Sequence, residues 1–122
     1  MQQLGPIDHD RRTSRSARPG QALNLFFAAH RRRLGVRALT CATADGRLVA
    51  GAGVGVAPAA VARAGHLVDR GHDGAHDLPR NVNRRHRIAT WRLRIGTTDY
   101  VVTSLGGGFN ADVGEGVRRI LG

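Results

Sequence analysis

The sequence contains no lysine, one cysteine and few aromatic residues. All 19 basic residues are arginine, which excludes motifs that need lysine, such as the Walker phosphate-binding loop. Cys41 alone cannot form an intramolecular disulfide, and a lone thiol in an apolar stretch is typical of a reducing compartment. The N-terminus lacks the apolar block of a signal peptide, and the longest uncharged stretch, Leu48 to Ala62, is too short to span a bilayer. We therefore expect a cytoplasmic protein without a membrane span.

The composition is strongly basic and fits one small domain. A chain of 122 residues buries one core rather than two. The formal net charge of +10 attracts nucleic acid, anionic lipid and acidic proteins alike, so the sign of the charge does not choose among these partners.

The first 20 residues differ in character from the rest of the chain. Residues 1–20 show no hydrophobic period and are rich in arginine and serine, which predicts a disordered arm. Residues 21–122 form the predicted domain. Its first helix spans Leu23 to Leu34, with Phe26, Phe27 and His30 on the same face, and Gly35 ends it.

The next segment predicts a β-hairpin and a second helix. Two β-prone runs, Val36 to Ala44 and Arg47 to Val54, flank Asp45-Gly46, a pair that favours a type I′ turn. A second helical pattern opens at Ala57-Pro58 and closes at Gly71. One side of that helix carries small and apolar residues, namely Val61, Ala64, Leu67 and Val68.

The last part of the chain predicts two further strands and a helix. Residues 72–87 show no core face, so they contain either a short edge strand around Leu78 to Val82 or a functional loop. Ala89 to Ile95 alternates apolar and polar residues, with Trp91 facing the core, and Tyr100 to Leu105 forms the returning strand. A Gly-rich helix follows, capped by Asn110 or Asp112, with these apolar residues on one face: Val113, Val117, Ile120 and Leu121.

The order of elements predicts an α/β (α+β) fold. It reads α-β-β-α-(β)-β-β-α, which favours an antiparallel sheet of four to five strands with flanking helices.

This order and three stretches of sequence resemble the roadblock / dynein-light-chain superfamily. The stretches are the helix that ends in Gly35-Val36, the segment Ala38 to Ala50 around Asp45-Gly46, and the late strand Asp99 to Thr103. The resemblance implies a profilin/roadblock-like fold and a homodimer formed by joining sheets and packing helices. It also implies, as in bacterial members, a non-catalytic partner of small Ras-like GTPases. The pattern of a strand, an Asp-Gly pair and an apolar strand also occurs in profilin-like, GAF-like and PAS-like sensory domains. The basic segment 72–87 is longer than the family usually carries.

Other chemistries find little support in the sequence. A histidine- and aspartate-rich stretch offers metal ligands, but its glycines oppose the helix that would align them. The stretch comprises His66, Asp69, His72, Asp73, His76 and Asp77. Gly106 to Gly108 lacks the pattern of a phosphate loop, and Thr103 and Ser104 lie in a predicted strand without a catalytic constellation. We expect no catalytic residue, no cofactor and no metal.

Two surfaces are the candidates for binding. The small-sided helix face of Val61, Ala64, Leu67 and Val68 is the predicted dimer interface. A set of arginines is the candidate contact with an anionic partner: Arg84, Arg85, Arg87, Arg92 and Arg94. The alternative to the GTPase-associated adaptor is therefore a nucleic-acid or anionic-surface binding protein on the same small fold, and a metal- or ligand-sensing domain is a third.

Overall fold

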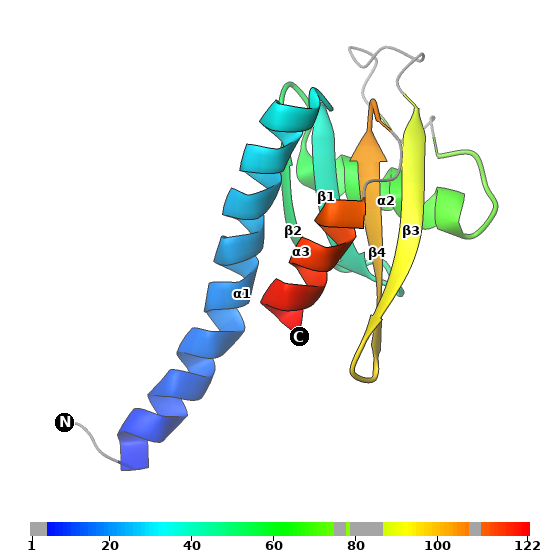
Figure 1. Ribbon diagram of the computed structural model, residues 1–122. Helices are drawn as coiled ribbons and strands as arrows, with labels where there is room; N and C mark the ends of the chain where they lie inside the picture. Colours follow the sequence, from blue (N-terminus) through cyan, green and yellow to red (C-terminus); the bar gives the residue numbers. More distant parts are fainter. Residues whose placement is uncertain (1–4, 75–77, 79–86, 108–110) are drawn as a thin grey trace.

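The computed structural model describes residues 5–74, 78, 87–107 and 111–122, with side chains from residue 19 onward. The elements in chain order are α1 (Gly5–Leu34), β1 (Ala38–Thr43), β2 (Leu48–Gly53), α2 (Pro58–Asp69), β3 (Ile88–Ile95), β4 (Thr98–Leu105) and α3 (Ala111–Leu121). The four strands form one antiparallel sheet in the order β2-β1-β4-β3 (Figure 1). The predicted α+β class and element order are confirmed. The possible fifth strand at Leu78 to Val82 lies, apart from Leu78, outside the described residues.

The helices cover both faces of the sheet. In Figure 1, α1 and α3 lie in front of the sheet and α2 lies behind it. The larger core cluster joins Leu23 and Phe27 of α1 to Val113 and Val117 of α3, over sheet residues that include Val102. A smaller cluster under α2 holds Ala38, Val56, Val61 and Leu105. Because helices cover both sheet faces, every residue of β1 except Thr43 is buried, instead of alternating between buried and exposed.

The β1–β2 hairpin forms at the predicted site with a different turn. The Gly46 amide donates to the Thr43 carbonyl, and the Thr43 amide donates to the Arg47 carbonyl, both at 2.8 Å. These bonds enclose a three-residue loop rather than the two-residue type I′ turn that we predicted. Gly46 has a φ of +99°, which explains why glycine is favoured there. The Thr43 hydroxyl also donates to the Asp45 carboxylate, and this hydrogen bond lowers the pKa of Asp45.

Helix α1 starts earlier than the sequence predicts. Residues 5–20, which we expected to belong to a disordered arm, are helical and continuous with residues 21–34. Adding turns to an existing helix requires no new nucleation, which is the unfavourable step in helix formation. Pro19 lies inside the helix, so one backbone hydrogen bond is missing there. The N-terminal part of α1 extends past the end of the sheet (Figure 1).

Helix α1 also covers one of the two sheet edges. It packs along β2, and the side-chain oxygen of Asn24 accepts a hydrogen bond of 2.9 Å from the Gly51 amide. That amide points away from β1, so a helix side chain satisfies a donor that an edge strand otherwise leaves exposed. The opposite edge of the sheet is β3.

Candidate interaction surface at the free edge of β3

The backbone of β3 has one edge that no described strand pairs with. The Gly106 amide donates to the Arg87 carbonyl at 2.8 Å, which fixes the side of the strand that faces β4. Because backbone groups alternate in direction along a strand, those of Ile88, Thr90, Arg92 and Arg94 point outward. Among the residues that the structure describes, no strand pairs with this side of β3. Such an edge is a template for pairing with another chain.

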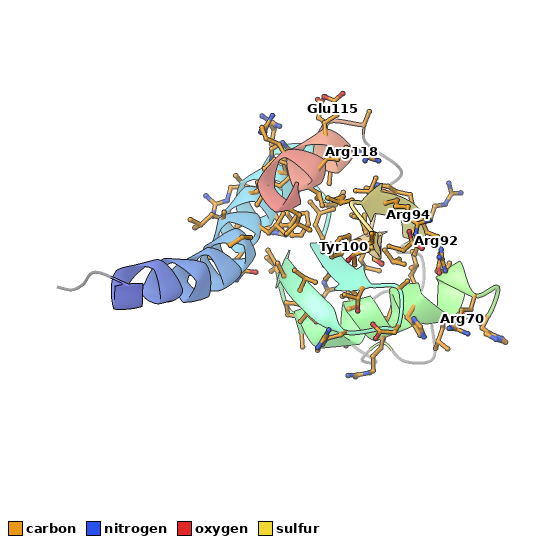
Figure 2. The ribbon with its side chains drawn as sticks, turned by 90° about the horizontal axis from the view of Figure 1, so that it is seen from below. Arg70, Arg92, Arg94, Tyr100, Glu115 and Arg118 are labelled. Carbon is orange, nitrogen blue, oxygen red and sulfur yellow. The ribbon has the colours of Figure 1, made fainter. Side chains whose placement is uncertain are left out.

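The far end of this edge has one local contact. Arg118 of α3 donates from Nη1 to the Arg94 carbonyl at 2.9 Å. Figure 2 shows Arg118 reaching from α3 toward the end of β3 that carries Arg94. Among the described residues, the outward groups of Ile88, Thr90 and Arg92 form the continuous part of the edge that has no partner strand.

Arg92 is held against α2 by a bidentate ion pair. Its Nε and Nη2 atoms donate to the two carboxylate oxygens of Asp69 at 3.0 and 2.7 Å. The Asp69 side chain is 9% exposed and the Arg92 side chain 51% exposed, so the pair closes the α2 side of the edge. The hydrogen bond and the charge of Asp69 both raise the pKa of Arg92. The planar fork of arginine suits this two-point contact, which fixes the side chain.

The candidate anionic-contact residues divide into three groups. Arg84 and Arg85 lie outside the described residues. Arg87 is exposed just before β3. Arg92 and Arg94 lie on β3, and each has a carboxylate of the same chain nearby. That carboxylate is Asp69 for Arg92 and Asp99 for Arg94, whose Nε lies 3.6 Å from Asp99 Oδ1. The structure therefore places Arg92 and Arg94 on one edge strand and Arg87 immediately before it, but the charges of Arg92 and Arg94 are partly compensated.

The predicted dimer face on α2 needs correction. Val61 and Ala64 are almost completely buried inside the single chain, where α2 packs on its own sheet. Leu67 and Val68 are half-buried. The small side chains of this face allow a close approach to the strands, because Gly65 lies directly over Thr103 of β4. Val61 and Ala64 therefore stabilise the monomer and cannot form an intermolecular contact without unfolding it.

The other sequence candidates are dispersed. His66 lies beside Gly46 of the hairpin, whereas Asp69 pairs with Arg92. His76 and Asp77 fall outside the described part of the chain, and within that part no three candidate ligands gather around a metal position.

The weak nucleophile candidates have structural contacts. The Ser104 hydroxyl donates to the Gly107 carbonyl at 2.7 Å, and Thr103 is buried beneath Gly65. Gly106 takes a φ of +96° where the chain leaves β4, which fits the turn expected there.

Sequence reasoning missed two residues at this edge, namely Asp69 as the partner of Arg92, and Arg118 of α3 as the donor to the Arg94 carbonyl. The sequence signal for both contacts is weak, because 23 residues separate Asp69 from Arg92 and 24 residues separate Arg94 from Arg118.

Comparisons with known proteins give no relative for this chain. No family model, no curated protein and no solved structure matches it. Among the described residues, no helix combines the length and hydropathy needed to cross a membrane.

Proposed function

We propose that this chain is a non-catalytic adaptor that forms a homodimer through β3 and binds a small Ras-like GTPase or another signalling protein. One observation carries the dimer: the outward backbone groups of Ile88, Thr90 and Arg92 have no partner strand among the described residues. Antiparallel pairing with a second copy satisfies these groups by an isologous contact. The GTPase partner comes from the resemblance to the roadblock superfamily.

The contacts of the arginines favour this function over nucleic-acid binding. Counterion release on phosphate binding requires free cationic side chains, whereas Arg92 is already bound by Asp69 at two atoms. An acidic protein surface remains compatible with the exposed Arg87 and Arg94.

Sedimentation equilibrium tests the dimer. The chain should sediment near twice its 13.0 kDa mass at micromolar concentration. Thr90→Pro removes an outward amide without removing a bond to β4, and should give a folded monomer by circular dichroism. Thr90→Ala keeps the amide and should remain dimeric. A wild-type chain that is monomeric throughout this range contradicts the dimer.

A binding titration tests the partner. The dimer is titrated with a small Ras-like GTPase of the same genome, loaded with GDP or with GTP, and separately with a single-stranded oligonucleotide. We expect saturable binding to the GTPase with a modest salt dependence. Binding to the oligonucleotide alone, with affinity that falls steeply as salt is added, indicates the anionic-surface alternative instead.

A further inference from the structure

The part of the β3 edge without a partner strand is short and is bounded at one end. Ile88, Thr90 and Arg92 direct their backbone groups away from β4, and these groups bond to no described residue. At Arg94 the outward carbonyl accepts the hydrogen bond of 2.9 Å from Arg118. The Arg118 side chain therefore occupies the place that a partner strand needs beside Arg94, and the open part of the edge runs from Ile88 to Arg92.

Two-fold symmetry restricts how this open part can pair with a second copy. When β3 pairs with itself in antiparallel fashion, the axis is perpendicular to the sheet and passes beside one residue, which then faces its own copy. Moving the axis by one residue slides the partner strand by two, so outward groups always meet outward groups. Each register is therefore defined by the residue at the axis.

Registers centred nearer the end of β3 meet an obstacle. An axis at Trp91 sets Ile88 opposite the partner's Arg94. The carbonyl of Arg94 is already bound by Arg118, so the partner strand competes with that side chain. An axis at Arg92 sets two guanidinium groups directly opposite each other, and like charges in that position destabilise a strand pair.

Registers centred nearer the start of β3 leave outward groups unused. An axis at Ala89 sets Arg92 opposite a residue that precedes the strand. An axis at Thr90 instead pairs every outward group of the open part, because Thr90 faces its own copy and Ile88 faces the partner's Arg92. No like charges then lie opposite each other in the open part, and the methylene groups of Arg92 can cover Ile88.

We propose that two copies of the chain pair in the register that places Thr90 opposite Thr90 of the partner subunit. The two sheets then join into one continuous sheet, with both α2 helices on one face and α1 and α3 of both chains on the other (Figure 1). A defined register matters because an edge strand with weak register is prone to slippage and to pairing with unrelated strands. This inference rests on the proposed dimer.

Single cysteines locate the axis. In this register the Cα atoms of the two Thr90 residues lie about 5.5 Å apart, within the range that a disulfide spans. Thr90→Cys should therefore become almost completely cross-linked under mild oxidation by copper phenanthroline, and migrate near twice the 13.0 kDa monomer mass on a non-reducing gel. Cys41 is buried, so the wild-type chain should stay free of this cross-link.

Neighbouring positions on β3 are the matched controls. The two copies of Ala89 lie about 8 Å apart and those of Arg92 about 14 Å apart, both beyond the reach of a disulfide. Ala89→Cys and Arg92→Cys should then lose the cross-link. An equimolar mixture of Ile88→Cys and Arg92→Cys should cross-link only between the two variants, which mass spectrometry identifies. This mixture tests the register even where Thr90→Cys fails to fold.

The outcomes distinguish this inference from the proposed function. A cross-link confined to Thr90→Cys and to the mixture of Ile88→Cys with Arg92→Cys supports the register. A cross-link that is strongest at Ala89→Cys or Arg92→Cys overturns the register and leaves the β3 dimer standing. A wild-type dimer that cross-links at none of these positions overturns both the register and the use of β3, and a monomeric wild-type chain overturns the dimer itself.

Discussion

Replacing Gly65 by alanine tests how closely α2 packs on the sheet. Gly65 lies in the middle of α2 and is buried. A methyl group built at this position lies 1.9 Å from Oγ1, 2.7 Å from Cγ2 and 2.8 Å from Cβ of Thr103. Thr103 is buried in β4, which is paired on both sides. Neither the branched side chain nor the strand can move away without disturbing the sheet.

Two opposing effects set the magnitude of this change. Alanine stabilises a helix interior by roughly 1 kcal/mol relative to glycine. Overpacking of a tight core costs typically about 1–3 kcal/mol, and a contact of this closeness belongs at the upper end. We therefore expect Gly65→Ala to lower the free energy of unfolding by about 2 kcal/mol, opposite in sign to the prediction from helix propensity alone.

Urea denaturation followed by circular dichroism measures the effect, and α3 supplies a control. A methyl group at Gly114 lies 3.6 Å from Trp91 and 3.9 Å from Leu93, which is ordinary contact, so Gly114→Ala should raise the midpoint. Combining Gly65→Ala with Thr103→Ala should cost less than the sum of the two changes, because the second removes the closest atoms. A Gly65→Ala midpoint at or above the wild-type value refutes the close approach.

Three further predictions concern other parts of the fold. Trp91 packs against the larger core cluster, so Trp91→Ala should lower the free energy of unfolding by about 3 kcal/mol, and native fluorescence should be blue-shifted from free tryptophan. Burial raises the pKa of the Cys41 thiol to about 12, so it should not react with a thiol reagent at pH 8 until the chain unfolds. The thiol has a pKa of 9.0 in the unfolded chain and of about 12 in the folded chain. Its titration therefore leaves the free energy of unfolding unchanged below pH 9 and lowers that free energy as the pH rises from 9 to 12. The urea midpoint should be lower at pH 10 than at pH 8, and this difference should be smaller in the Cys41→Ala variant. Asp69→Asn should free Arg92 and lower the thermal midpoint by less than Trp91→Ala does, whereas an unchanged midpoint shows that the ion pair contributes no stability.

The sequence alone determined the features that depend on neighbours along the chain. Leu23 and Phe27 fall on one helical face because an α-helix repeats every 3.6 residues, and both are buried as that spacing predicts. The alternation from Ala89 to Ile95 placed Trp91 on the core side of β3, where the structure has it. Asp45-Gly46 marked the hairpin, although the loop length depended on hydrogen bonds that the pair does not specify.

Only the tertiary structure decided which surfaces face inward and which residues meet. The small side chains on one face of α2 were equally compatible with packing in a dimer and with packing on the chain's own sheet. The contact of Gly65 with Thr103 shows that this face packs on the sheet. Gly116 weakens α3 as a helix, yet a methyl group there lies 2.0 Å from the Phe26 ring of α1. The Arg92–Asp69 pair likewise joins two elements separated by a long connection. Periodicity specifies a face of each element, but the partner of that face is set by how the elements pack together.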